Sequence, residues 1–514
     1  MKSAVFSSMI FFELTTSTRG GYITKSTTMI ILLLGLMTSI MGDDNSKLFN
    51  FTQRVDHFGS SNLGNLTFTQ NLLVDDTRWG GAQTRAPIFV LFGGEDGELF
   101  APERYGTLAK SADEFKAMII HIQHRFYGDS IPLGTIESAM ADHQVRSCLA
   151  TDQALQDYAV IIQSLKVNYS ARNSPVIVMG IGYAGALATW FRLRYPEIAI
   201  GALASSTPLL YYGNSTTSDG YCSIVSNDFK DVNPKCYESI RRSWKEIDDI
   251  AIKPNGLAEL TNIFNTCRPL QSSEEIKHWL AQMYSAAVQY DEPNNLGVKT
   301  ICDYAVNKPS SIDGVATAIR GKLIMENCLQ NHIIGVKSPF EPFANDTVAW
   351  EWQRCNELIF PVGCLEETML PAKPFNFIEF KKSCQSRFGV LPNPHSPISF
   401  FGSKNIIESL TGFGGNIIFS NGLRDPFSSG SILQDLSKTI VAIKTTEGTT
   451  CMDMTSSNLD FNDPEWLIAQ RKQELDIFKD WIDHFHHISG SYPTSFSLFI
   501  TYCLQILVFS FMTL

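Results

Sequence analysis

The chain has 514 residues, of which 44% are hydrophobic and 11% aromatic, so it can form one large core with an insertion, or two domains. Its 41 basic and 52 acidic residues give a net charge of −11. No basic run is present to bind a phosphate backbone, which argues against a nucleic-acid partner.

The N-terminal region, residues 1–42, is expected to direct the chain into the secretory pathway. Residues 29–41 form an apolar run after Lys25 that has the length of a signal-peptide core and is too short to span a bilayer comfortably. More residues precede this run than a signal peptide usually has there, which indicates a translation start assigned too far upstream.

Residues 48–212 alternate between apolar runs and helical patterns. Four apolar runs predict strands, at residues 86–92, 117–123, 175–179 and 199–205. Residues 151–169 carry apolar side chains at i, i+3 and i+4, which predicts a helix with one buried face. Uninterrupted apolar strands are typical of a parallel sheet covered on both faces, so this region is predicted to be the first part of an α/β core.

Residues 213–400 lack the alternation of strands and are predicted to be an inserted helical cap. Helical patterns dominate at residues 236–252 and 273–290. Eight of the eleven cysteines fall in this segment, at Cys222, Cys236, Cys267, Cys302, Cys328, Cys355, Cys364 and Cys384. In an oxidising compartment most of these cysteines are expected to pair, in a connectivity that spacing does not reveal.

Residues 401–487 are predicted to complete the core. Strand character returns at residues 416–420 and 439–444, and a last helix is expected to begin at Pro464 after an Asp463 cap. The expected inward face of that helix consists of Leu475, Phe478, Trp481, Ile482 and Phe485.

The C-terminal tail, residues 496–514, is a second apolar stretch without charge. A membrane anchor, a lipid-anchor signal and translation into non-coding sequence are three alternatives for it. Membrane attachment through this tail and a homodimer both stay open. Five glycosylation sequons accord with a secretory route, at Asn50, Asn65, Asn168, Asn214 and Asn345.

The glycine-rich turn at residues 180–185 fits two motifs. One is G-x-G-x-x-G, the dinucleotide fingerprint, which would make the chain an oxidoreductase. This remote alternative requires a carboxylate at the end of the next strand, which instead ends in Ser205-Ser206-Thr207. The other is the nucleophile elbow G-x-S-x-G of α/β-hydrolases, with its serine missing.

Longer segments resemble the serine peptidase family that contains lysosomal Pro-Xaa carboxypeptidase and dipeptidyl-peptidase II, the plant branch in particular. They are Phe51–Phe58 (FTQRVDHF), Ala86–Phe89 (APIF), His124–Ser130 (HRFYGDS), Gln153–Tyr158 (QALQDY), the elbow, Gly201–Ser206 (GALASS) and Asn421–Pro426 (NGLRDP). The resemblance covers roughly residues 48–487. It implies an α/β-hydrolase sheet with a helical cap, a secreted or vacuolar/lysosomal location, proline-containing peptide substrates and no cofactor.

The same resemblance assigns the catalytic positions. The family's elbow reads Gly-Gly-Ser-Tyr-Gly-Gly, so its serine nucleophile falls on Gly182 and its oxyanion N–H on Tyr183. The catalytic aspartate falls on Asp425, and the histidine base falls on Thr450. Further positions implied to bind substrate are Glu95, Trp350, Trp352 and Phe427.

Two of the three triad positions therefore lack their chemistry, and the chain is predicted to be a catalytically impaired member. An active prolyl-directed exopeptidase, rescued by other residues, is the alternative, and a decayed gene product is a third. His484, His486 and His487 are expected to be cations at a helix end rather than metal ligands. Cys451, next to the lost base, is expected to belong to a disulfide.

Overall fold

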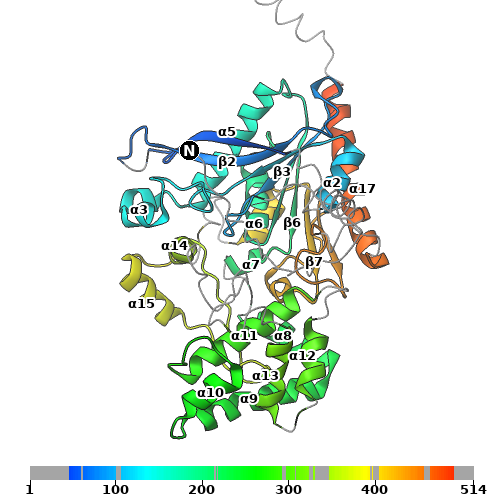
Figure 1. The fold of residues 1–514 in the computed structure, drawn as a ribbon. Helices are drawn as coiled ribbons and strands as arrows, with labels where there is room; N and C mark the ends of the chain where they lie inside the picture. Colours follow the sequence, from blue (N-terminus) through cyan, green and yellow to red (C-terminus); the bar gives the residue numbers. More distant parts are fainter. Residues whose placement is uncertain are drawn as a thin grey trace, which may run out of the picture. The chain divides into compact units, whose positions relative to one another are not determined.

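The computed structural model describes residues 46–59, 62–99, 106–212, 216, 218–291, 297–306, 308, 310–322, 328–329, 347–393, 396, 405–455 and 463–490 (Figure 1). The chain divides into two units, Met1–Asn45 and Ser46–Leu514, and every described residue belongs to the second. The predicted signal region, the C-terminal tail and the sequons at Asn214 and Asn345 lie outside the described residues.

One mostly parallel sheet of eight strands forms the centre of the described chain (Figure 1). Its strands are β1 (Lys47–Arg54), β2 (Thr67–Asp75), β3 (Ile88–Phe92), β4 (Met118–Ile122), β5 (Val176–Ile181), β6 (Gly201–Ser205), β7 (Ile417–Gly422) and β8 (Ile440–Thr445). Their spatial order is β1-β2-β4-β3-β5-β6-β7-β8, with β1 and β2 antiparallel to their neighbours and the remaining pairs parallel. This topology confirms the predicted α/β-hydrolase fold.

Both faces of the central strands β3 to β7 are buried, which explains why these strands are largely apolar. On β3, Ile88, Val90 and Phe92 join a core with α5 (Thr151–Asn168) and α6 (Tyr183–Arg194). Phe89 and Leu91 point to the opposite face. Helices α2 (Gly106–Phe115) and α17 (Glu465–Gly490) cover that face. Successive strand residues thus alternate between two hydrophobic layers.

All six predicted strands are present within two residues of the expected bounds, and the predicted helix at 151–169 is α5. On α17, Phe478, Trp481 and Ile482 are buried as expected and Leu475 packs beside them, whereas Phe485 is only half-buried. Strands β1 and β2 were not predicted. Their inward positions include Gln53 and Gln70, two buried glutamines that bond to each other at 3.2 Å and break the apolar alternation.

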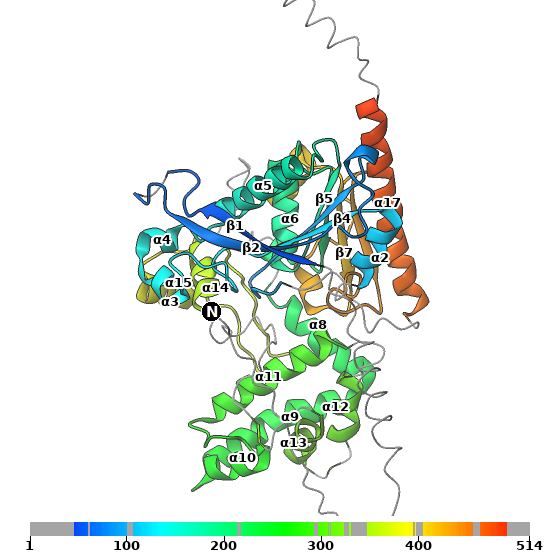
Figure 2. The ribbon, with the colours of Figure 1, turned by 45° about the horizontal axis from the view of Figure 1, so that its top comes forward.

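Within the described part of residues 220–322, six helices, called the cap helices here, pack on one another beside the sheet (Figure 1, Figure 2). They are α8 (Gly220–Val232), α9 (Pro234–Ala251), α10 (Gly256–Phe264), α11 (Ser273–Gln289), α12 (Gly297–Ala305) and α13 (Ser311–Lys322). The predicted helices at 236–252 and 273–290 are α9 and α11. Asn233 caps α9 by accepting from the Lys235 N–H at 2.9 Å, with Pro234 at the first helical position.

Four disulfides pair the eight cysteines of this part of the chain, as expected. They are Cys222–Cys364, Cys236–Cys302, Cys267–Cys328 and Cys355–Cys384. Cys451 is buried and lies outside these four disulfides, contrary to the expectation. The boundaries of the predicted cap at residues 213 and 400 stay a prediction.

The remaining elements connect the sheet to its covering layers. They are η1 (Ala82–Thr84), α3 (Ile136–Ala141), α4 (His143–Ser147), α7 (Leu209–Tyr212), α14 (Thr347–Asn356), α15 (Phe377–Phe388), α16 (Ile406–Phe413) and η4 (Pro426–Gly430). Helix α14 packs on α3 and α15 rather than among the cap helices. Among the helices of the described residues, none is both long and apolar enough to cross a bilayer.

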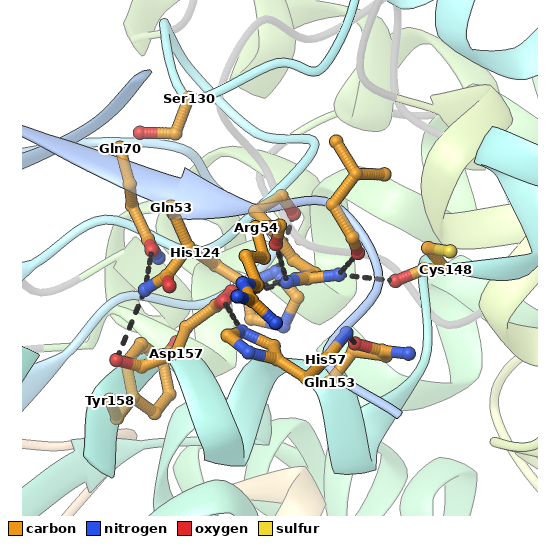
Figure 3. A network of polar contacts seen from close by, with 12 residues as sticks. Gln53, Arg54, His57, Gln70, His124, Ser130, Cys148, Gln153, Asp157 and Tyr158 are labelled. Carbon is orange, nitrogen blue, oxygen red and sulfur yellow. Dashed lines mark hydrogen bonds and ion pairs between the residues drawn. The ribbon is translucent and has the colours of Figure 1, made fainter. Parts of the chain in front are cut away.

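A buried ionic network joins β1, the segment after β4 and α5 (Figure 3). Arg125 is fully buried, and its Nε and one terminal nitrogen each donate to Asp157 at 2.6 Å. Its other hydrogen bonds go to the carbonyls of Arg54, Val55 and Cys148. All five guanidinium N–H groups are therefore used, and they tie Arg125 of the HRFYGDS segment to the end of β1, to Cys148 and to α5.

Candidate active site

The site lies where the carboxyl ends of the parallel strands meet, the usual place for a ligand in such a sheet. Gly182 connects β5 to α6 with φ 58° and ψ −118°, a backbone conformation that side chains rarely adopt. Its N–H donates to the carbonyl of Ser205 at 3.0 Å. A Cβ added at Gly182 would meet no atom within 4 Å. The turn at Gly182 thus combines a backbone conformation that is rare for side chains with open space, as expected for a nucleophile position that has lost its side chain.

Gly180 has a different role in the same turn. A Cβ at this position would lie 2.1 Å from the carbonyl oxygen of Ala184. The absence of a side chain therefore lets the end of β5 approach the first turn of α6. Close backbone approach is what the glycines of an elbow supply.

Asp425 and Thr450 lie in contact beyond the ends of β7 and β8. The hydroxyl of Thr450 donates to Asp425 Oδ1 at 2.7 Å, and the Phe427 N–H donates to the same oxygen at 3.0 Å. The Thr450 N–H donates to the carbonyl of Gln289, at the end of α11, at 3.2 Å. Asp425 is fully buried, and burial raises the pKa of its carboxyl from 3.8 to about 6.

A cavity of about 70 Å³ lies in front of these residues. Its lining consists of Glu95, Ile181, Gly182, Tyr183, Ser206, Pro208, Tyr212, Gln289, Tyr290, Trp350, Arg354, Phe360, Phe427 and Thr450. The structure thus brings together most of the residues expected from the sequence, with Asp425 directly behind Thr450. Aromatic rings form much of the wall, as in many pockets for small organic ligands.

The side chains of the two tryptophans on α14 point to different parts of the molecule. Trp350 lines the cavity, with its ring centroid 5.4 Å from that of Tyr183. Trp352, also expected at the substrate site, points instead into the core near α3. There its Nε1 donates to the carbonyl of Leu149 at 3.2 Å, and the guanidinium of Arg146 lies 4.8 Å from its ring.

A chain of buried polar side chains holds the hydroxyl of Tyr183. Its hydroxyl accepts from Gln353 Nε2 at 2.9 Å and lies 3.3 Å from His124 Nε2. His124 Nδ1 donates to the Arg125 carbonyl at 2.6 Å, so Nε2 accepts from the tyrosine. Burial lowers the pKa of His124 to about 4, and this imidazole is neutral at physiological pH.

The N–H of Tyr183 is the expected oxyanion donor. As the first residue of α6, Tyr183 has no intrahelical acceptor for this N–H. The positive end of the helix dipole favours negative charge at the same place. This N–H is therefore free of intrahelical bonding and stands at the positive end of α6, as the expected oxyanion role requires.

Of the residues that the structure describes, no histidine lines the cavity. His486, far from the cavity residues in the sequence, lies near Arg85: its Nε2 is 3.3 Å from the Arg85 carbonyl oxygen. Within the described residues no cluster of His, Cys, Asp or Glu could hold a metal ion. Ser206 lines the cavity, its hydroxyl accepts from the Cys451 N–H at 2.7 Å, and no imidazole of the described residues lines the cavity beside it.

Several cavity residues were not predicted, namely Tyr212, Tyr290, Arg354 and Phe360. For Arg354 a signal was present in the sequence. It follows Trp350 by four residues on α14, so both side chains lie on one helix face. The other three lie at helix ends or in loops, where no periodicity points to a site.

Residues 53–474 match the model of the family described as serine carboxypeptidase S28. Lysosomal Pro-X carboxypeptidase from Homo sapiens is 32% identical over 470 residues, covering 87% of this chain and 90% of that protein. Thymus-specific serine protease from Mus musculus is 27% identical, covering 84% and 86%. Among solved structures, a proline iminopeptidase from Mycobacterium smegmatis aligns with a TM-score of 0.33 and 10% identity, covering 86% of this chain and 100% of that one.

Proposed function

Because the chain belongs to the serine carboxypeptidase S28 family, we propose that it is a member that binds proline-containing peptides without cleaving them. The observation that carries this proposal is the hydrogen bond that the Thr450 hydroxyl donates to Asp425, at the place where a triad histidine would donate its ring N–H to the aspartate. A threonine hydroxyl cannot take up and return a proton near neutral pH. Gly182 offers no oxygen to attack a carbonyl.

The remaining parts of the site support ligand binding. The elbow backbone, the Tyr183 N–H and an aromatic-walled cavity are all in place. The rings of Trp350, Phe360 and Phe427 offer flat apolar surfaces suited to a proline ring. The proline preference itself is carried over from the name of the relatives, which are Pro-X carboxypeptidases.

Two alternatives are less well supported. An active prolyl-directed exopeptidase would need a nucleophile and a base beside Asp425, and the described cavity wall contains no histidine. A dinucleotide-binding oxidoreductase would need a carboxylate at the end of β6, where Ser205, Ser206 and Thr207 stand.

Features outside the cavity support a place in the secretory pathway, in a lysosome or vacuole or outside the cell. The relatives are named lysosomal. Four disulfides accord with an oxidising compartment. The sequon asparagines that the structure describes, Asn50, Asn65 and Asn168, are all exposed and so accessible to glycosylation.

The test is to incubate the purified chain with a proline-containing peptide and, separately, with a serine-reactive phosphonate. We expect no product and no covalent label, because loss of the nucleophile or base of a serine peptidase costs about 10⁶ in turnover, as in subtilisin. Labelling of the unmodified chain by the phosphonate would refute the proposal.

A gain-of-function variant tests the same idea from the other side. In Gly182→Ser combined with Thr450→His, the serine enters open space and the imidazole stands next to Asp425. We expect phosphonate labelling and measurable peptide cleavage in this variant. The matched control, Gly182→Ala with Thr450→His, has the same backbone strain but no hydroxyl, and is expected to stay inactive.

A further inference from the structure

Two buried carboxyl groups lie at neighbouring positions by the ends of β6 and β7. Asp453 accepts from the hydroxyl of Ser205 at 2.6 Å. Glu474, on α17, accepts from the hydroxyl of Ser420 at 2.6 Å. Ser205 and Ser420 are paired residues of β6 and β7, which brings the two carboxyls together. Asp453 is 2% exposed and Glu474 3%, and Asp453 Oδ2 is buried without a hydrogen-bond partner in the described chain.

The loop of residues 449–455, called the Thr450 loop here, connects Asp453 to the cavity. Thr450 itself lines the cavity. The N–H of Cys451 donates to the hydroxyl of Ser206, another cavity residue, at 2.7 Å. Asp453, two residues further along, holds the loop to β6 through its serine contact. A change of charge at Asp453 therefore acts on a loop that forms part of the cavity wall.

Arg471 of α17 holds the same loop without neutralising the two carboxyls. Its guanidinium donates at 2.7 to 2.9 Å to three carbonyls of the Thr450 loop, those of Met452, Asp453 and Thr455. One terminal nitrogen also pairs with the carboxylate of Asp463. Within the described residues no ion pair joins Arg471 to the carboxyl of Asp453 or Glu474. A lost proton would thus leave a buried negative charge without a direct partner.

The surroundings favour the protonated form of both carboxyls. Burial raises the pKa of Asp453 and of Glu474 above their ordinary values of 3.8 and 4.5, and the charge of Asp453 raises the pKa of Glu474 further. The charge of Arg471 opposes this rise. From the loop after β7, Asp425 is a third carboxyl, whose pKa is raised by burial and, to a smaller extent, by the charge of Asp453. Strands β6 and β7 face the pair with uncharged serine hydroxyls.

We propose that Asp453 and Glu474 form a pH switch, which holds the Thr450 loop in the cavity wall while the two carboxyls are protonated and releases it when they ionise. Ionisation sets two like charges close together in a buried place, and movement of the loop away from α17 separates them. Because folding raises the pKa of both groups, the hold on the loop is complete below about pH 3.8 and is lost as the pH rises. The switch does not depend on which ligand the cavity binds, so it goes beyond the proposed function.

Hydrogen exchange of the unmodified chain at pH 5 and at pH 8, corrected for the intrinsic exchange rate at each pH, measures the hold on the loop. The informative amides are those of Cys451, Met454 and Thr455, which donate to Ser206 or within the loop. We expect their protection to fall at least about tenfold at pH 8, the change in equilibrium that corresponds to one unit of pKa.

A double variant removes the switch. In Asp453→Asn combined with Glu474→Gln both charges are absent at every pH, and each amide keeps an oxygen that can accept from its serine. The fall in protection should then be largely abolished. The matched control, Asp480→Asn, removes an exposed carboxyl of α17 and should show the same fall as the unmodified chain. Glu357 and Asp425 also titrate in this range and are intact in all three chains, so their effects are common to all of them.

Three results would refute the switch. One is equal protection of the Thr450 loop at both pH values in the unmodified chain. Another is the same fall in the double variant as in the unmodified chain, because another group would then control the loop. If the double variant does not fold, Glu474→Gln alone takes its place, and an undiminished fall in that variant is the third. None of these results bears on whether the cavity binds a peptide, so the two proposals fail separately.

Discussion

At Gly182 the backbone keeps an elbow conformation although the side chain that needs it is missing. A residue with a side chain in such a conformation costs of order 1–3 kcal/mol, a cost that glycine avoids. The elbow is therefore less strained here than it would be with serine. Its shape is maintained by its neighbours, such as the Gly182 N–H bonded to Ser205.

A pair of alanine substitutions separates strain from crowding in this turn. Gly182→Ala should lower the free energy of unfolding by about 1–2 kcal/mol, because the Cβ meets no atom and only backbone strain is added. Gly180→Ala should cost clearly more, because its Cβ would lie 2.1 Å from the Ala184 carbonyl oxygen. Urea denaturation of both variants measures this. Equal losses would contradict the assignment.

Glu357 makes stability depend on pH. It accepts from the Thr151 N–H at 2.8 Å and from the Thr151 hydroxyl at 2.9 Å, and burial raises its pKa from 4.5 to about 8. The folded chain therefore holds a proton that the unfolded chain releases above pH 4.5. The contribution of protonated Glu357 to the free energy of unfolding is complete below pH 4.5 and is lost as the pH rises to about 8.

We therefore expect Glu357→Gln, which resembles the protonated carboxyl, to lose part of this pH dependence. At pH 8 to 9 the variant should be more stable than the unmodified chain, by roughly 2 kcal/mol, and near pH 4.5 the two should be similar. Thermal unfolding across pH 4.5–9 gives the comparison. Glu366→Gln, at an exposed position, serves as control and should follow the unmodified chain.

At the scale of elements, one arginine connects the site to the cap helices. Arg424 directly precedes Asp425, and its guanidinium reaches Asp228 on α8 at 2.5 and 2.9 Å. It also bonds to Asp291, just beyond the end of α11. The hydrogen bond to Asp228 is the main cause that raises the pKa of Arg424, so this residue stays charged. Arg424 thereby connects the loop that contains Asp425 to the cap helices α8 and α11.

Replacing Arg424 by glutamine should loosen this connection. Two largely buried carboxylates would lose their cation, and we expect a loss of about 2 kcal/mol in the free energy of unfolding. Hydrogen exchange should accelerate in α8 and at the end of α11. Arg387→Gln breaks a more exposed pair and should leave exchange in α8 and α11 unchanged. Unchanged exchange in Arg424→Gln would show that the connection is dispensable.

For the whole molecule, the described disulfides all lie between residues 222 and 384 and none reaches the sheet. Cys222–Cys364 spans 142 residues, whereas Cys355–Cys384 spans 29. A longer closed loop restricts the unfolded chain more. The first disulfide should therefore contribute more to stability than the last.

We expect the double serine variant of Cys222 and Cys364 to be destabilised by about 1 kcal/mol more than that of Cys355 and Cys384, from loop entropy alone. Denaturation of both variants under non-reducing conditions tests this. A larger loss for the shorter loop would show that local packing outweighs chain entropy.

Sequence reasoning succeeded where one physical effect dominates. The strands β3 to β8 were each predicted, because β3 to β7 are buried on both faces and largely apolar and β8 keeps an apolar run although it is partly exposed. β1 and β2 were missed because Gln53 and Gln70 are satisfied by each other, which only the folded sheet reveals. The glycine turn was identified from spacing and resemblance together.

Within the site, helix geometry accounts for both an error and an omission. Residues two positions apart on a helix point in nearly opposite directions, so Trp350 and Trp352 cannot face the same cavity. Arg354 shares the face of Trp350, yet a lone arginine on a helix is usually solvated. Its place at the cavity wall becomes visible only in the folded chain.

The outermost strand has a practical consequence for anyone preparing this protein. β1 is at one end of the sheet order and presents backbone groups along its outer side, with Leu48 62% and Phe49 36% exposed. An exposed strand edge of this kind can pair with a strand of another molecule unless a bulky group blocks it. Sugar chains on Asn50, within β1, and on Asn65, just before β2, would stand along that border. We expect material without such sugars, as from a bacterial host, to precipitate more readily through this edge than material that carries them.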